Sequence, residues 1–252
     1  MNVERHRTLL PRGVAILAVL LVIVVEIAAP ISESSVPILN RIAAFSILVP
    51  LISGLWVFVA LGFDMRCLLA LVITAFTVEL LLAVFSHLDW NSTWLLNIYT
   101  LLEFGLLMVI FMVWETRPAW RKIMLFSVLI FIAIWVLGKV FFREEAGLRV
   151  FDSVTATMES VMLIMVGMFA LIRLTTEDIL GVFQSPRFWF VFAILVYFTG
   201  NLIIFALGQY VLRQEFGEHV LVWGIHSVLG ITSNLLYAWA FICTYRLWKG
   251  SH

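Results

Sequence analysis

Long apolar runs separated by short polar connections make up most of this chain. A helix that crosses a hydrocarbon layer of about 30 Å needs about 20 mostly apolar residues. The sequence predicts eight such helices, over 13–30, 43–63, 66–87, 93–114, 121–142, 151–173, 187–212 and 219–247. The connections are too short to hold another domain, so we expect residues 1–252 to form a single all-α transmembrane bundle.

The first of these segments could also be a signal peptide. No small-residue cleavage pattern follows it, because Pro30 is a poor successor to Ala28 and Ala29 at a cleavage site. We therefore treat 13–30 as the first helix of the bundle.

Composition supports a membrane protein. Of 252 residues, 63% are hydrophobic and 13% charged, with a mean hydropathy of +1.08, whereas soluble domains average about 45–50% apolar and about 25% charged residues. The formal net charge of +0 gives no argument for a nucleic-acid partner. The partner that composition predicts is the lipid bilayer.

The basic residues predict the orientation of the chain. With the N-terminus inside, the outer side holds Arg41, Lys139, Arg143, Arg149 and Arg213, which leaves 11 of the 16 Lys and Arg residues on the inner side. Cytoplasmic loops carry the excess of positive charge in membrane proteins. We therefore expect both termini in the cytoplasm.

Polar residues interrupt several segments at a common depth. With a rise of about 1.5 Å per residue, Glu103 lies about 15 Å, Glu159 about 12 Å and Glu79 about 10 Å below the outer surface. An ionised carboxylate at such a depth costs several kcal/mol unless it is paired, protonated or hydrated. The residues that we expect to share this layer, as a ligand- or proton-binding pocket, are Glu79, Tyr99, Glu103, Glu159, Asn201, His226 and Asn234.

The last segment favours an organised pocket. His226, Gly230, Ser233, Asn234 and Tyr237 are spaced at i, i+4, i+7, i+8 and i+11, which makes one continuous stripe on a helix. Hydrogen bonding between helices is the simpler role for the serines and asparagines. For the glutamates we favour a functional site, because packing alone can use less costly residues.

The two deepest carboxyls carry the main expectation about the pocket. We expect Glu103 and Glu159 to hydrogen-bond to each other across helices. One of the two should be protonated, because two such charges repel strongly in a low dielectric. Binding of a cation, or loss of that proton, would then alter the packing of the helices.

Three segments carry a resemblance to known proteins: NIYTLLEFGLLM at 97–108, PRFWFVFAILVYFTGNLIIF at 186–205 and ITSNLLYAWAF at 231–241. They resemble uncharacterised bacterial membrane proteins of seven or eight helices, some of which accompany sensor histidine kinases. The resemblance marks Glu103, Asn201 and Asn234. It implies a receptor-like role in a bacterial inner membrane, although its motifs carry no established chemistry.

Signatures of common enzymes are missing from the sequence. We find no HxxxH or HExxH zinc motif, no GxSxG, no glycine-rich phosphate loop and no CxxC, and we expect Cys67 and Cys243 to be free thiols. The last segment has no central lysine that could hold retinal. Carboxylates with one imidazole are a workable metal site, but the sequence does not favour one and identifies no cofactor.

Three functions remain open. The first is a receptor or sensor whose polar pocket, in the outer half of the bundle, binds a small ligand, cation or proton and signals through a histidine kinase or another partner protein. The second is an intramembrane lipid-modifying enzyme with a carboxylate and His226 as acid and base. The third is a proton-coupled carrier that uses Glu103 and Glu159 as a relay. A carrier should have polar positions continuing inward, whereas the inner halves of most spans are apolar, so we favour the sensor.

Overall fold

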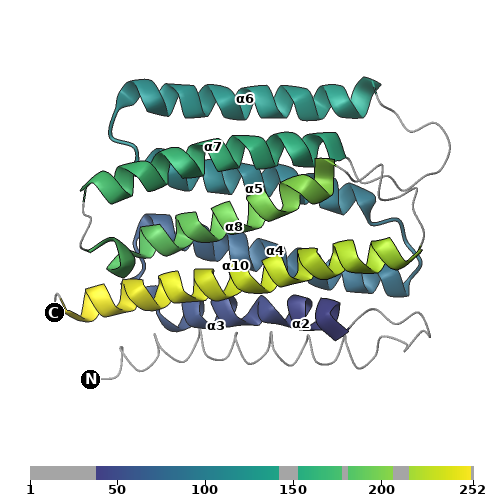
Figure 1. Ribbon diagram of the computed structural model, residues 1–252, viewed down its shortest axis with the longest axis horizontal. Helices are drawn as coiled ribbons and strands as arrows, with labels where there is room; N and C mark the ends of the chain where they lie inside the picture. Colours follow the sequence, from purple (N-terminus) through teal and green to yellow (C-terminus); the bar gives the residue numbers. More distant parts are fainter. Residues whose placement is uncertain (1–37, 142–152, 178–180, 207–215, 251–252) are drawn as a thin grey trace.

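The computed structural model describes residues 38–141, 153–177, 181–206 and 216–250, and every regular element in these ranges is helical (Figure 1). The predicted span at 13–30 lies outside the described residues. In chain order the elements are α2 (Ile38–Ser46), α3 (Leu48–Trp56), η1 (Phe58–Ala60), α4 (Phe63–His87), α5 (Thr93–Trp114), α6 (Pro118–Phe141), α7 (Ser153–Glu177), η2 (Val182–Gln184), α8 (Pro186–Ala206) and α10 (Phe216–Gly250).

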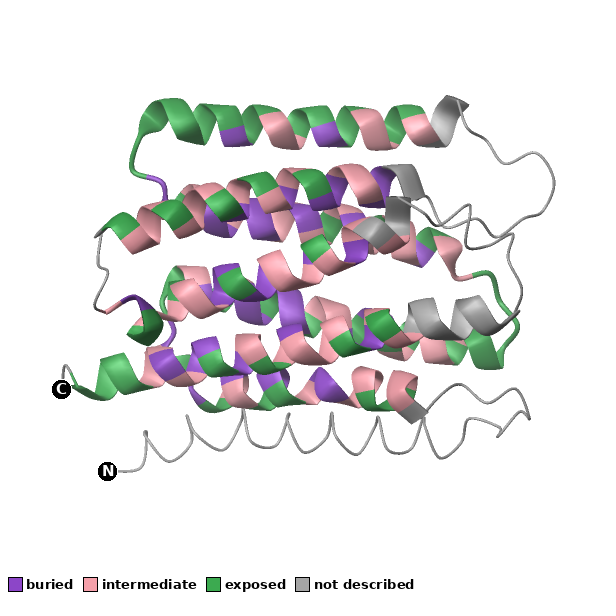
Figure 2. Cartoon of the chain, viewed as in Figure 1, coloured by how far each residue is buried: buried purple, intermediate pink, exposed green. Residues whose placement is uncertain are grey.

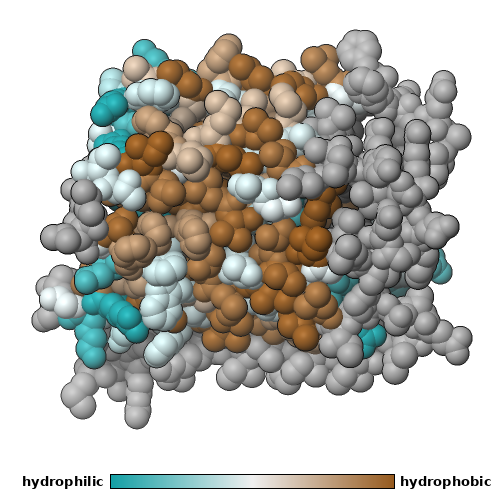
Figure 3. Space-filling view, viewed as in Figure 1, coloured by the Kyte–Doolittle hydropathy of each residue, from teal (hydrophilic) through white to brown (hydrophobic). Residues whose placement is uncertain are grey.

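Six described stretches are long and apolar enough to cross a membrane: Leu39–Trp56, Phe63–His87, Thr93–Trp114, Pro118–Gly138, Thr155–Thr176 and Gly224–Gly250. A shorter apolar stretch, Pro186–Leu202, lies in α8. Apolar side chains cover the middle of the surface in Figure 3, and hydrophilic ones gather at the end where α10 terminates. The prediction of an all-α, multi-pass membrane protein is therefore confirmed. The number of eight spans and the orientation of the termini stay predictions.

The predicted segment ends agree best where a polar residue marks them. The prediction of 93–114 coincides with α5, whose start follows Asn91 and Ser92 and whose end precedes Glu115. The prediction of 43–63 was wrong at both ends, because this helical region begins at Ile38 and ends at Trp56. Residues 57–62 turn the chain through η1 and an extended Gly62. This turn is itself apolar, so hydropathy cannot distinguish it from the helices on either side.

A proline explains why α2 and α3 are separate helices. Pro50 has no backbone N–H, and its ring clashes with the carbonyl group four residues earlier. That carbonyl belongs to Ser46, the last residue of α2, and α3 begins two residues later at Leu48. Within α2, the Ser46 hydroxyl donates a hydrogen bond to the Ala43 carbonyl at 2.6 Å.

The long α10 helix organises the packing of the bundle. It packs along α8 on one side and along α2 and α3 on another, while α7 packs on α8 and α4 packs on α5. The α6 helix lies at the edge, against α5 and α7, and most of its surface is exposed in Figure 2. Buried residues concentrate among the other helices, which therefore enclose the interior of the bundle.

A glycine sets the distance between α3 and its neighbours. A Cβ atom built on Gly54 would lie 2.7 Å from Leu69 Cδ1 in α4 and 3.0 Å from the Phe241 ring in α10. Small residues commonly permit such close approach between membrane helices. Gly105 in α5 differs, because a Cβ atom there would meet nothing within 4 Å.

These two glycines give a matched test of the packing. We expect Gly54→Ala to lower the free energy of unfolding by about 1–3 kcal/mol, because the buried Leu69 and Phe241 side chains must shift to admit the methyl group. Gly105→Ala should instead be neutral or raise it by up to about 1 kcal/mol, since alanine favours the helix. Thermal unfolding of both variants in detergent measures the difference, and equal effects would contradict this packing.

Candidate functional site

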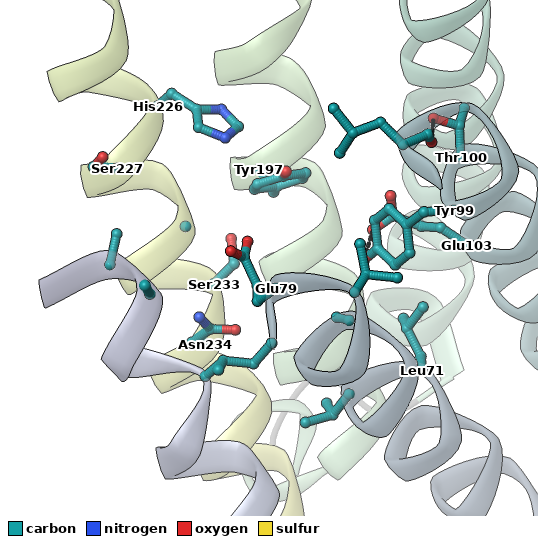
Figure 4. A pocket seen from close by; sticks show the side chains of 18 of the residues that line it. Leu71, Glu79, Tyr99, Thr100, Glu103, Tyr197, His226, Ser227, Ser233 and Asn234 are labelled. Carbon is teal, nitrogen blue, oxygen red and sulfur yellow. Dashed lines mark hydrogen bonds between the residues drawn. The ribbon is translucent and has the colours of Figure 1, made fainter. Parts of the chain in front are cut away.

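A cavity of about 390 Å³ lies inside the bundle, between α2, α4, α5, α7, α8 and α10 (Figure 4). Its polar and aromatic lining comes from helices far apart in the sequence. These residues are Asn40, Glu79, Tyr99, Thr100, Glu103, Glu159, Tyr197, Phe198, His226, Ser227, Ser233, Asn234 and Tyr237. Six of the seven residues that the sequence predicts for the pocket line this cavity, and the seventh, Asn201, contacts one of them.

Each of three helices contributes one carboxyl group to the cavity. Glu103 comes from α5, where Tyr99 lies one turn earlier and donates a hydrogen bond from its hydroxyl to Glu103 Oε1 at 3.1 Å. Glu79 comes from α4 and is exposed, so a small molecule can reach its carboxylate. Glu159 comes from α7 and is only 4% exposed.

Glu159 has an incomplete set of hydrogen bonds. Its Oε1 atom is buried and has no hydrogen-bond partner among the described residues. The sequence predicts that Glu103 and Glu159 bond to each other, but Glu103 Oε1 receives the Tyr99 hydroxyl instead. The two carboxyls do lie within electrostatic range of one another. A buried polar atom without a partner is costly and is rare in native proteins, so this atom is ready to accept a hydrogen bond.

His226 is held in place by Asn201. The His226 Nδ1 atom lies 2.7 Å from Asn201 Oδ1, between α10 and α8. Because an amide oxygen only accepts hydrogen bonds, Nδ1 is the donor in this arrangement. Asn201 is fully buried, and the Tyr197 ring lies 6.0 Å from the His226 ring between centroids. Asn201 therefore acts on the cavity by orienting His226.

The predicted stripe on α10 lies along the cavity. All five of its members, from His226 to Tyr237, are lining residues. Two of them bond to neighbouring helices: Asn234 Nδ2 donates to Ser46 Oγ at 2.8 Å, and Ser233 Oγ donates to the Ala193 carbonyl at 3.3 Å. These bonds match the structural role that the sequence favours for such residues.

Asn40, Ser46 and Tyr197 belong to this site but were not predicted from the sequence. Asn40 accepts a hydrogen bond from Ser227 Oγ at 2.7 Å, and Ser46 accepts one from Asn234. Neither was assigned to the pocket, and Asn40 fell in a predicted connection because the helical region begins five residues earlier than expected. Tyr197 was also missed, although it lies one turn before Asn201 on the same side of α8. That spacing was the signal that could have identified it.

Below the cavity the bundle is closed by an apolar layer. On α4, α5, α7, α8 and α10, large hydrophobic side chains at most 2% exposed lie beyond the cavity lining, toward the end where α10 terminates. We call this set the apolar floor. It consists of Leu68, Leu107, Phe111, Leu163, Phe190, Ile194 and Phe241.

Beyond the apolar floor, charged and aromatic side chains connect four helix ends. We call this the basic end of the bundle, since Arg66, Arg117, Arg121, Lys122, Arg173, Arg187, Arg246 and Lys249 lie there. At the start of α4, Asp64 Oδ2 accepts a hydrogen bond from Trp114 Nε1 at 2.8 Å. The Arg187 guanidinium, at the start of α8, lies 5.3 Å above the Trp114 ring and 3.8 Å from Asp64 Oδ2.

A second ion pair at the basic end links α5 to α7. Glu115 is 4% exposed and accepts hydrogen bonds from Arg173 Nη1 at 2.9 Å and from the Arg117 backbone N–H at 2.8 Å. Burial acts to raise the pKa of Glu115, but these bonds and the nearby positive charges outweigh burial. The pKa of Glu115 therefore lies below its ordinary value.

No protein-family model, curated protein or solved structure matches this chain. The class that the fold defines is a multi-pass α-helical membrane protein. Among the described residues, no group of three or more His, Cys, Asp and Glu side chains is placed to hold a metal ion.

The Glu115 ion pair predicts a pH-dependent loss of stability. Because the folded-state pKa of Glu115 is lowered, its contribution is fully present above the unfolded pKa of about 4.3 and is lost as the pH falls below it. We expect Glu115→Gln to lower the free energy of unfolding by about 1–3 kcal/mol at pH 7. The gap to the wild type should close on acidification, as denaturant titrations between pH 3 and pH 7 would measure. A gap that widens at low pH would contradict the ion pair.

Proposed function

We propose that this protein is a ligand-binding membrane receptor. A small molecule binds in the cavity, and the resulting change in helix packing is transmitted to a partner protein at the basic end. The observation that carries the proposal is the contrast between an acidic cavity in one half of the bundle and an apolar floor beneath it. A pocket that is closed on this side suits binding, because the described helices offer a bound molecule no polar path through the apolar floor.

The apolar floor argues against a carrier. A carrier must open its binding site alternately to the two faces of the membrane. Here Leu107 and Phe111 follow Glu103 along α5, and Ile194 and Phe190 lie beyond Tyr197 along α8. Passage would require these buried side chains to separate.

The hydroxyl groups near His226 argue against a hydrolytic enzyme. A serine nucleophile must be hydrogen-bonded to its base. Ser227 instead donates to Asn40 at 2.7 Å, and Ser233 donates to the Ala193 carbonyl. Both hydroxyls thus stabilise contacts between helices.

A continuous series of packed rings supports transmission from the cavity to the basic end. Tyr237 lines the cavity within electrostatic range of Glu103, and its ring lies 6.0 Å from the Phe190 ring. The Phe190 ring in turn lies 5.2 Å from that of Trp114, which bonds to Asp64 beneath Arg187. A shift of Tyr237 would therefore press on groups that link α4, α5 and α8.

The proposal also includes an orientation, a membrane and a signalling partner for the protein. The excess of Lys and Arg at the basic end supports a cytoplasmic location for that end, in the inner membrane of a bacterium. The signal would pass from the basic end to another protein. A sensor histidine kinase is the partner that the resemblance of three segments implies.

A double-mutant cycle tests the proposed transmission. Glu103→Gln in the cavity and Arg187→Gln at the basic end are combined, and the free energies of unfolding of the four proteins are compared in detergent. Distant substitutions normally add to within about 0.3–0.5 kcal/mol. We expect a coupling energy above this limit, because both residues act on one series of packed rings.

Arg121→Gln is the matched control for this cycle. Arg121 is also basic and lies at the same end, but it is exposed on α6, away from the ring series. Its cycle with Glu103→Gln should be additive, and Phe190→Leu should abolish the coupling between Glu103 and Arg187. Additive behaviour of Glu103 and Arg187 would contradict transmission along this route.

A further inference from the structure

We propose that the cavity binds a small organic amine, with its ammonium group between the Glu103 and Glu159 carboxyls and its carbon skeleton against the tyrosine rings. This inference deepens the proposed receptor function, because it names the class of ligand for the same cavity. It rests on the charge, hydrogen-bonding capacity, aromatic surface and size of the cavity.

The charge of the lining favours a cation. The described lining residues include three carboxyl groups and one imidazole, and none of them is Lys or Arg. A carboxylate or phosphate ligand would therefore meet acidic groups with no basic partner. A neutral ligand would leave the cost of burying these acids without compensation.

The hydrogen-bonding capacity of Glu159 favours an ammonium group. Its Oε1 atom is buried and lacks a partner in the described part of the chain, so a donor on the ligand would complete its hydrogen bonding. Glu103 lies within electrostatic range of Glu159, and its Oε1 already accepts the Tyr99 hydroxyl. A primary ammonium has three donors, which is enough to bond both carboxyls at once.

The aromatic lining provides further attraction for a cation. Tyr99, Tyr197, Phe198 and Tyr237 all line the cavity, and Tyr197 lies within electrostatic range of Glu79, Glu103 and Glu159. In Figure 4 the Tyr197 ring lies between His226 and the Glu79 side chain. Ring faces attract cations, most strongly where water is excluded.

The size of the cavity favours an organic cation over a bare metal ion. A volume of about 390 Å³, filled at the density of a protein interior, accommodates about 20 non-hydrogen atoms. Within the described ranges, no group of three or more His, Cys, Asp and Glu side chains is placed to hold a metal ion. A molecule of several carbon atoms fills this volume better than a single ion.

Three probes with one skeleton separate the effect of charge from that of shape. These are 2-phenylethylamine, the neutral 2-phenylethanol and the anionic phenylacetate, with Mg²⁺ as a metal control. Each is titrated into the purified full-length protein in detergent, with thermal unfolding and calorimetry as readouts. We expect the amine to raise the melting temperature and the other three to leave it unchanged.

Two charge-neutralising variants assign the binding to the cavity. Glu159→Gln should weaken amine binding by about 10- to 100-fold, because one charged hydrogen bond is lost. Asp89→Asn removes one negative charge from the exposed α4–α5 turn, at a left-handed residue with φ 53° that asparagine tolerates. It should bind the amine as the wild type does.

A measurement on the unmodified chain tests the proposal even if the variants fail to fold. Dicyclohexylcarbodiimide attaches to buried carboxyls, and the amine should slow its attachment to Glu103 and Glu159 as followed by peptide mass spectrometry. The proposal is overturned if no amine effect is found in either assay, if Glu159→Gln binds as tightly as the wild type, or if phenylethanol, phenylacetate or Mg²⁺ is equally effective. Amine binding without coupling between Glu103 and Arg187 would overturn the receptor function alone, and coupling without amine binding would overturn this inference alone.

Discussion

The cost of burying carboxyl groups is the constraint on which the rest of the structure depends. Three apolar helices, α4, α5 and α7, each carry a glutamate at a depth where hydrocarbon would surround it. All three glutamates line one interior cavity, which lowers this cost. Polar groups from α2, α8 and α10 complete the lining, so the fold places most of its costly residues in a single interior space.

The remainder of the bundle interior has the opposite character. The apolar floor consists of hydrophobic side chains alone. At the basic end, the Glu115–Arg173 ion pair joins the ends of α5 and α7, and contacts of Asp64 with Trp114 and Arg187 join α4, α5 and α8. A cavity with an unpartnered buried carboxyl oxygen therefore lies above a hydrogen-bonded junction of four helix ends. In the proposed receptor, the cavity changes when a molecule binds, and the basic end transmits that change to the partner protein.

The sequence predicted the class of fold and most of the pocket because both follow from strong local signals. Apolar length identified the helices, and helical spacing placed His226, Ser233 and Asn234 on one side of α10. The predictions failed where hydropathy does not mark a boundary. Hydropathy could not detect the apolar turn after Trp56, and it placed the start of the first described helix after Ile38, which left Asn40 outside. The hydrogen bond expected between Glu103 and Glu159 is also not formed, because the Tyr99 hydroxyl, one turn away, bonds to Glu103.

Native mass spectrometry of the protein, extracted in a mild detergent, tests most directly the central claim that the buried carboxyls form a ligand site. The account predicts that part of the wild-type protein retains a small bound molecule, and that Glu159→Gln loses it while Asp89→Asn retains it. A bound molecule that Glu159→Gln retains, or a protein that carries only lipid in both variants, would contradict it.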